Sequence, residues 1–191
     1  TGCSHAPKKE KAPWAYIQNR DARQKYVLIQ QTASHMTYEK LYENMKWLND
    51  QYPNEDIITI TRAGIYGDYG QTFDSETELQ YKKRAAKILK PYTEKSFRDK
   101  TSHFRVLAFN QYYYHSGQYK KLSNFGHEII RLGGLGGEVM VAVGAAMHAL
   151  ELDQKNDILN ARVTALEARI MWEKMYNMHD PEFRQADYEN S

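Results

Sequence analysis

The chain has 191 residues, of which 41% are hydrophobic and 26% are charged, a composition typical of a folded globular protein rather than a disordered one. Its single cysteine excludes an internal disulfide framework, a four-cysteine zinc site and a CxxC redox pair. A formal net charge of +2 does not indicate nucleic-acid binding, and we expect no nucleic-acid partner. The longest apolar run covers residues 139–147, which is too short for a membrane-spanning helix.

The first residues carry the clearest indication of location. Cys3 follows Thr1 and Gly2, and a polar segment with several lysines follows it. This pattern resembles the lipobox of bacterial lipoproteins, in which a small residue precedes a lipidated cysteine. The resemblance implies that Cys3 is a lipid anchor and that the protein lies in the bacterial periplasm on a membrane, with Ser4 favouring the outer membrane. The alternative is a free thiol in a solvated tail.

The remainder of the chain predicts an all-α fold. We expect eight helices in chain order, over residues 21–35, 38–52, 55–69, 79–89, 102–114, 118–132, 138–152 and 157–178. The β-branched run at 57–61 also fits a strand, but we favour a helix because no partner strand is apparent. Short connections predict antiparallel helix hairpins.

Helix ends follow from a few residues. Ser75 and Glu78 have the spacing of a capping box, and Pro91 is expected to end the helix that they begin. The glycines at 133–137 predict a helix C-cap and a close helix crossing. They do not fit a dinucleotide-binding fingerprint, because they follow a helix and the spacing of the glycines fails at Val139.

The hairpins resemble tetratricopeptide repeats, which are stacked pairs of helices with small, aromatic, glycine and proline residues at set positions. The positions that carry the resemblance are Tyr38, Leu41, Met45, Leu48 and Pro53, then Ala63, Tyr66 and Gly70, then Val106, Phe109, Tyr113, Gly117 and Tyr119, then Ala142, Ala149 and Leu152. The resemblance implies a short solenoid that binds protein partners along its concave face. An ordinary irregular helical bundle is the competing interpretation.

These patterns divide the chain into three parts. Residues 1–20 are predicted to form the tether, 21–178 the helical-repeat domain and 179–191 an acidic tail with a net charge of −3.

The candidate partner-binding residues lie in the tyrosine-rich stretch before Gly117. Tyrosine offers a large apolar face and a hydroxyl group, which suits a protein interface. Tyr112 and Tyr114 flank Tyr113, which we expect to point inward, so we predict that both are exposed at an interface. Gln111 and His115 share this helix and are predicted to be polar residues of the groove.

We find no catalytic or metal-binding pattern. His127 and Glu128 do not form an HExxH motif, because Arg131 stands where the second histidine would be. The seven histidines show no ligand spacing, and we predict no catalytic residue, no metal and no cofactor.

The sequence therefore favours a non-catalytic envelope lipoprotein that acts as a scaffold or adaptor in a larger membrane-associated assembly, such as secretion, pilus, motor or outer-membrane machinery. The main alternative is a periplasmic helical enzyme or ligand-binding domain that acts on cell-wall material. A cytoplasmic repeat adaptor is a further alternative.

Overall fold

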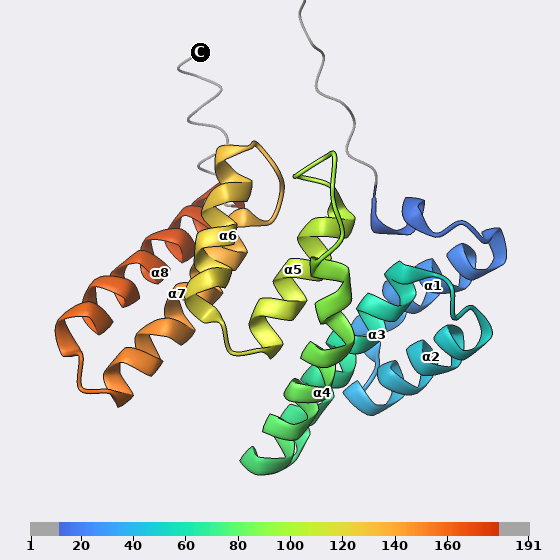
Figure 1. The fold of residues 1–191 in the computed structure, drawn as a ribbon, viewed down its shortest axis with the longest axis horizontal. Helices are drawn as coiled ribbons and strands as arrows, with labels where there is room; N and C mark the ends of the chain where they lie inside the picture. Colours follow the sequence, from blue (N-terminus) through green and yellow to red (C-terminus); the bar gives the residue numbers. More distant parts are fainter. Residues whose placement is uncertain (1–11, 180–191) are drawn as a thin grey trace, which may run out of the picture. The chain divides into compact units, whose positions relative to one another are not determined.

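The computed structural model describes residues 12–179 and is all-α over this range, with no strand. Eight α-helices are joined by short connections and by three 3₁₀ turns (Figure 1). The helices are α1 (Arg20–Thr32), α2 (Tyr38–Gln51), α3 (Asp56–Tyr69), α4 (Ser75–Thr93), α5 (His103–His115), α6 (Tyr119–Arg131), α7 (Gly137–Gln154) and α8 (Ile158–His179); the 3₁₀ turns are η1 (Pro13–Tyr16), η2 (Ala33–His35) and η3 (Gly70–Thr72). The predicted fold class is confirmed, and the β-branched run at 57–61 is helical.

The packing divides the chain after His115 into two compact units, a finer division than the single helical domain predicted over 21–178. The first unit contains η1 to α5 and the second contains α6 to α8. Within each unit, helices that follow one another in the chain pack together, as expected for helix hairpins. Residues 12–20 are part of the predicted tether, but they contain η1 and Ile17, which is buried in the core of the first unit, so this part of the prediction requires correction. Residues 1–11 of the predicted tether and residues 180–191 of the predicted acidic tail lie outside the described residues.

Two helix ends differ from the prediction. The N-cap of α4 is Asp74 rather than Ser75, because the Asp74 carboxylate accepts hydrogen bonds from the backbone N–H groups of Glu76 and Thr77. Pro91 does not end α4, which continues to Thr93. A proline this close to the C-terminus removes only one intrahelical hydrogen bond, so two further residues remain helical.

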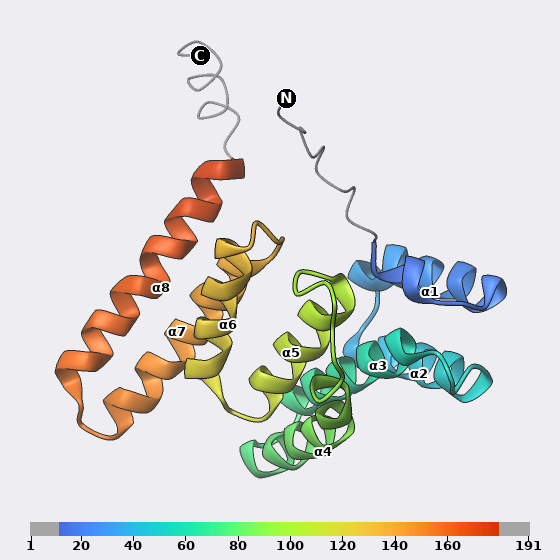
Figure 2. The ribbon, with the colours of Figure 1, turned by 45° about the horizontal axis from the view of Figure 1, so that its top comes forward.

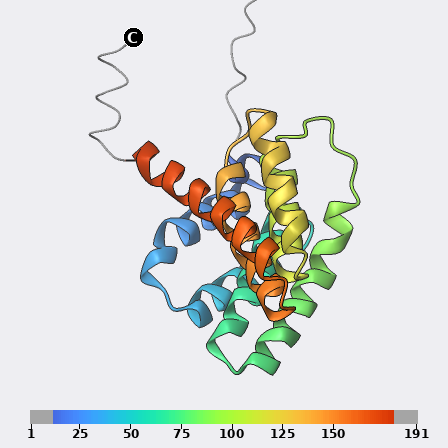
Figure 3. The ribbon, with the colours of Figure 1, turned by 90° about the vertical axis from the view of Figure 1, so that its left-hand side faces the viewer.

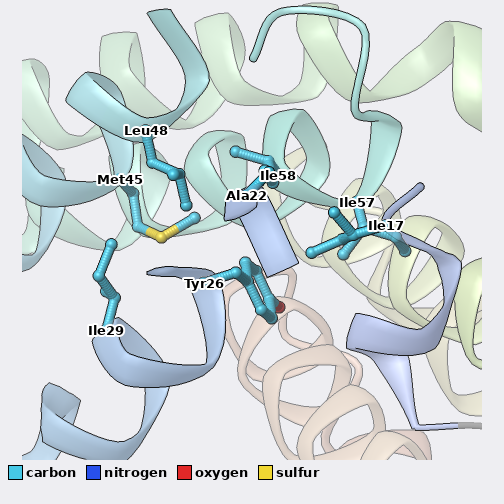
Figure 4. Packing of buried hydrophobic residues seen from close by; sticks show 8 residues of the cluster. All are labelled: Ile17, Ala22, Tyr26, Ile29, Met45, Leu48, Ile57 and Ile58. Atoms are coloured by element: carbon cyan, nitrogen blue, oxygen red, sulfur yellow. The ribbon is translucent and has the colours of Figure 1, made fainter. Parts of the chain in front are cut away.

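The core of the first unit is formed by Ile17, which follows η1, and by side chains from α1, α2 and α3. Figure 4 shows Ile29 of α1 beside Met45 and Leu48 of α2, while Ile17 and Ile57 meet at the other end of the cluster. These helices present apolar residues at three- and four-residue intervals, so one face of each is removed from water. Further along α3, Ile60 and Ala63 form a second cluster with residues of α4 and α5.

Glu55 joins the start of α3 to the segment that enters α1. Its carboxylate oxygens accept hydrogen bonds from the backbone N–H groups of Gln18 and Asn19, at 2.9 and 2.7 Å, and the residue is buried. Without this carboxylate, both amides would lose a charged acceptor in part-buried hydrogen bonds.

We therefore expect Glu55→Ala to lower the free energy of unfolding by about 1–3 kcal/mol, measured by urea denaturation. Glu94→Ala is the matched control, because Glu94 is exposed and, among the described residues, its ion pair is with an exposed lysine at 3.9 Å. The control should change stability by less than about 0.5 kcal/mol. Equal effects of the two substitutions would contradict the proposed role of Glu55.

The second unit is held together by a close crossing of α6 and α7 (Figure 2). A Cβ atom on Gly126 would lie 2.6 Å from the carbonyl oxygen of Gly137, so the two backbones approach each other where neither residue has a side chain. Further along α7, a Cβ atom on Gly144 would lie 2.6 Å from the backbone nitrogen of Ser123 in α6, so the two backbones are close there as well. The predicted close crossing is confirmed.

The predicted C-cap is confirmed as well. Gly133 has a φ of 70°, and the N–H of Gly134 donates to the carbonyl oxygen of Ile129 at 2.9 Å, which is the Schellman arrangement. The glycines of 133–137 therefore end α6, and Gly137 then begins α7 against Gly126.

Candidate functional site

The four predicted partner-binding residues lie on α5, within the first unit. Tyr112 is half-buried and packs against the second core cluster, so its ring contributes to the core. Tyr114 is also half-buried, rather than exposed as predicted. Its ring lies beside that of His115, with centroids 5.2 Å apart, and the Lys82 ammonium lies 5.4 Å from its centre.

Gln111 and His115 lie against the backbone of α3. A Cβ atom on Gly64 would come within 2.6 Å of the Gln111 amide oxygen, and one on Gly67 within 2.4 Å of the His115 ring. Two glycines inside a helix lower its stability, and here they allow the polar side chains of α5 to reach the α3 backbone. The His115 side chain has no exposed surface, so the expectation that it lines an open groove requires correction.

His115 and Asp68 form the centre of a polar cluster between α3 and α5. The His115 Nε2 atom lies 3.0 Å from the Gln111 amide oxygen and 3.9 Å from the Asp68 carboxylate. Burial lowers the pKa of His115 to about 4, and burial raises the pKa of Asp68 to about 6. The positive charge of Lys82 lowers the pKa of both groups, so it adds to the effect of burial on His115 and opposes the effect of burial on Asp68. In both cases burial has the larger effect.

Shifted pKa values often mark catalytic groups, but the placement of His115 favours a structural role. A general base must reach the proton that it removes, and a ring without exposed surface does not meet a substrate. The cluster therefore supplies polar contacts between helices, and the absence of a catalytic residue stays a prediction.

A surface on the other side of α3 gathers a different set of side chains. Five aromatic rings from α2, α3, α4 and the loop before α4 contact one another, and we call them the aromatic cluster. Its members are Tyr42, Tyr66, Tyr69, Phe73 and Tyr81. Tyr66 and Tyr81 are stacked with centroids 4.5 Å apart, and Tyr42 and Tyr69 are stacked at 5.9 Å. Such contacts make a rigid surface at little cost in side-chain entropy.

A pocket of 360 Å³ opens beside this cluster, and we call it the basic pocket. Its lining residues are Tyr42 of α2, Arg62 and Tyr66 of α3, and Arg84, Lys87 and Ile88 of α4. Residues four apart lie on the same face of a helix, so α3 presents Arg62 with Tyr66, and α4 presents Arg84 with Ile88. Three cationic side chains thus converge on two phenol groups.

The cations of the basic pocket have no ion-pair partner in the part of the chain that the structure describes. Among residues 12–177, no carboxylate forms an ion pair with Arg62, Arg84 or Lys87, and no acidic residue lines the pocket. Arg84 donates to the Tyr66 hydroxyl at 3.4 Å, a contact that raises the pKa of the guanidinium group. Like charges held together repel one another, and a bound anion would relieve this repulsion.

The second unit has a polar pocket of 450 Å³ between α6, α7 and α8. Two acidic groups that line this pocket already have partners. Asp157 accepts hydrogen bonds from the Asn160 amide, and Glu167 pairs with His127 at 2.7 Å. This pocket is therefore a weaker candidate for binding a charged ligand than the basic pocket.

Metal binding and membrane insertion find no support in the described helices. No group of three or more histidine, cysteine, aspartate or glutamate residues within 12–179 is arranged to hold a metal ion. None of the helices there combines the length and apolar character needed to cross a bilayer. Cys3, the predicted lipid anchor, lies outside the described residues.

No protein-family model, curated protein or solved structure matches the chain. The tetratricopeptide and lipoprotein resemblances therefore stay predictions, and the functional argument rests on the surfaces of the two units.

The basic pocket could have been suspected from one sequence signal. Residues 82–90 hold five basic residues within one helix, including Arg84 and Lys87. Nothing in the sequence placed Arg62 and Tyr42 beside them, because this juxtaposition depends on how α2 and α4 pack on α3.

Proposed function

We propose that the protein is a non-catalytic scaffold or adaptor, and that the basic pocket binds an acidic segment of a protein partner. The observation that carries the proposal is the convergence of Arg62, Arg84 and Lys87, which no carboxylate of the described residues neutralises, on the pocket beside the aromatic cluster.

The chemistry of the pocket fits a carboxylate-bearing peptide. Arginine binds carboxylates through two parallel hydrogen bonds, and the hydroxyl groups of Tyr42 and Tyr66 can donate to further oxygens. Burial raises the pKa of Tyr42, so its hydroxyl keeps its proton at neutral pH. Tyrosine and arginine are also the residues that most often contribute strongly to protein–protein interfaces.

The location of this scaffold is a further part of the proposal. Lipidation at Cys3 would place both units at a bacterial envelope membrane, with the outer membrane favoured, as part of a multi-subunit assembly. The lysine-rich residues before Pro13 would add attraction to anionic lipid headgroups.

The binding proposal can be tested with a fluorescein-labelled hexaglutamate peptide and fluorescence anisotropy at low salt. We expect the double substitution Arg62→Gln with Arg84→Gln to weaken peptide binding by about 10-fold or more, because two charge-assisted hydrogen bonds are lost. The same variants should be compared by cross-linking and mass spectrometry in the native host, where the pocket variant should lose its main protein partner.

Lys83→Gln with Lys90→Gln is the matched control. Both residues are exposed on α4, they do not line the basic pocket, and their replacement changes the net charge by the same amount. Equal loss of binding in both double variants would show attraction to net charge only, and unchanged binding in the pocket variant would overturn the proposal.

A further inference from the structure

Helix α8 carries an apolar stripe that no part of the described chain covers. The stripe consists of Leu159, Val163, Leu166 and Ile170, whose exposed fractions are 75%, 62%, 56% and 51%. Their spacing of four, three and four residues places them on one face of the helix, over about 17 Å. A stripe of large aliphatic side chains on the surface indicates an interaction site.

The opposite face of α8 already has its partner. Ala161 and Ala168 are buried, and α8 packs against α7 within the second unit. Each residue of the stripe is two positions from one of these alanines, a rotation of about 200° around the helix axis. Figure 3 shows α8 in front of the other helices of its unit, with α7 behind it. A second helix can therefore approach the stripe without displacing α7.

The residue types in the stripe match a particular kind of helix pair. In a seven-residue repeat, Val163 and Ile170 take position a, while Leu159 and Leu166 take position d. β-branched residues at a with leucine at d favour a parallel, two-stranded coiled coil. The occupant that suits this stripe is therefore an identical stripe.

The charged residues beside the stripe favour the parallel orientation. Arg162 takes position g and Glu167 position e, and in a parallel pair these positions meet across the interface. One carboxylate oxygen of Glu167 pairs with His127 of its own chain at 2.7 Å, and the side chain is 38% exposed, so its other oxygen can accept from Arg162 of the second copy. In an antiparallel pair, Arg162 would instead approach the partner's Arg169. The next g and e residues, Arg169 and Lys174, have the same charge, but each is already paired within its own chain, with Glu173 at 2.7 Å and Glu138 at 3.6 Å.

We propose that the exposed stripe of α8 docks a second copy of this chain as a parallel helix pair. The contact is short, so the dimer is weak and forms at elevated local concentration, such as on a membrane or within an assembly. The proposal is independent of the basic pocket, which belongs to the other unit.

Sedimentation velocity of the whole chain, from about 1 µM to 1 mM, tests whether the dimer forms. We expect a concentration-dependent dimer, and Leu166→Glu should raise its dissociation constant by about 100-fold or more, since each dimer would bury two carboxylates. Leu28→Glu is the matched control, because Leu28 is 61% exposed on α1 and lies outside the stripe. A protein that is monomeric over the whole range would overturn the proposal, as would a dimer that both substitutions weaken equally.

The orientation is tested by Ile170→Cys in a Cys3→Ser background, which leaves one thiol per chain. In a parallel pair, the two residues at position 170 face each other, and mild oxidation should give a disulfide-linked dimer. In the antiparallel pair, they would be about 16 Å apart and would not cross-link. A dimer that Leu166→Glu disrupts but that fails to cross-link through Cys at 170 would overturn the parallel arrangement. Circular dichroism should show native helix content for every variant.

Discussion

Replacing Gly126 by alanine should lower the free energy of unfolding by about 3 kcal/mol or more. The added Cβ would lie 2.6 Å from the carbonyl oxygen of Gly137 and 2.8 Å from the backbone nitrogen of Val141. Both contacts are with backbone atoms, so no side-chain rotation relieves them, and α6 and α7 must move apart. Urea denaturation followed by circular dichroism measures the loss.

The sign of this effect separates packing from helix propensity. Alanine stabilises the interior of a helix relative to glycine by about 0.5–1 kcal/mol, so propensity alone predicts a gain in stability. Gly133→Ala is the matched control: Gly133 has a φ of 70° and no atom within 4 Å of an added Cβ, so only backbone strain of about 1–2 kcal/mol is expected. A gain in stability from Gly126→Ala would show that α6 and α7 do not cross at Gly126.

Removing Asp68 or His115 singly should change the pH dependence of stability in opposite directions. The pKa of His115 is about 4 in the folded chain, against 6.5 for an ordinary histidine, so the unfolded chain binds more protons between these values. His115 therefore destabilises the fold as the pH falls from 6.5 to 4. The pKa of Asp68 is about 6, against an ordinary 3.8, so the folded chain binds more protons between them, and Asp68 adds stability as the pH falls from 6 to 3.8.

In the native chain, the loss of stability from His115 and the gain from Asp68 oppose each other as the pH falls. Replacing one of the two residues leaves the effect of the other uncompensated. Relative to the native protein, Asp68→Asn should lose at least about 1 kcal/mol of stability between about pH 7 and pH 4.5, and His115→Gln should gain a similar amount. Lys82 and its ion-pair partner Glu78 are present in every variant.

Urea denaturation at each pH gives the free energies, and the comparison with the native protein removes the contribution of all other titrating groups. His35→Gln is the control, since His35 is exposed in η2, and it should follow the native pH dependence. Parallel curves for Asp68→Asn and His115→Gln would contradict the burial of the two groups in one cluster.

The positions of the helices could be predicted from local signals. The spacing of Met45 and Leu48 in α2, and the glycines after α6, both depend on residues close together in the chain. The details that failed were also local but closely balanced: Asp74 and Ser75 are both good capping residues, and Pro91 lies near enough to the end of α4 to be tolerated.

The candidate site could not be predicted in the same way. The sequence places Gln111 and His115 on one face of α5, but it does not tell which neighbour that face meets. The answer depends on Gly64 and Gly67 of α3, more than 40 residues away, which leave room for these side chains. The basic pocket likewise combines residues from α2, α3 and α4.

The sequence by itself determined the all-α class, the order of the eight helices and the glycine-mediated approach of α6 and α7, because these depend on periodicity and on backbone conformations that glycine permits. Only the tertiary structure decided that the tyrosine-rich face of α5 packs inward, that Arg62 and Arg84 share a pocket, and that the stripe from Leu159 to Ile170 is uncovered. The physical reason is the same in each case. An amphipathic helix specifies which of its faces is apolar, but which neighbour covers that face is set by contacts between residues far apart in the chain.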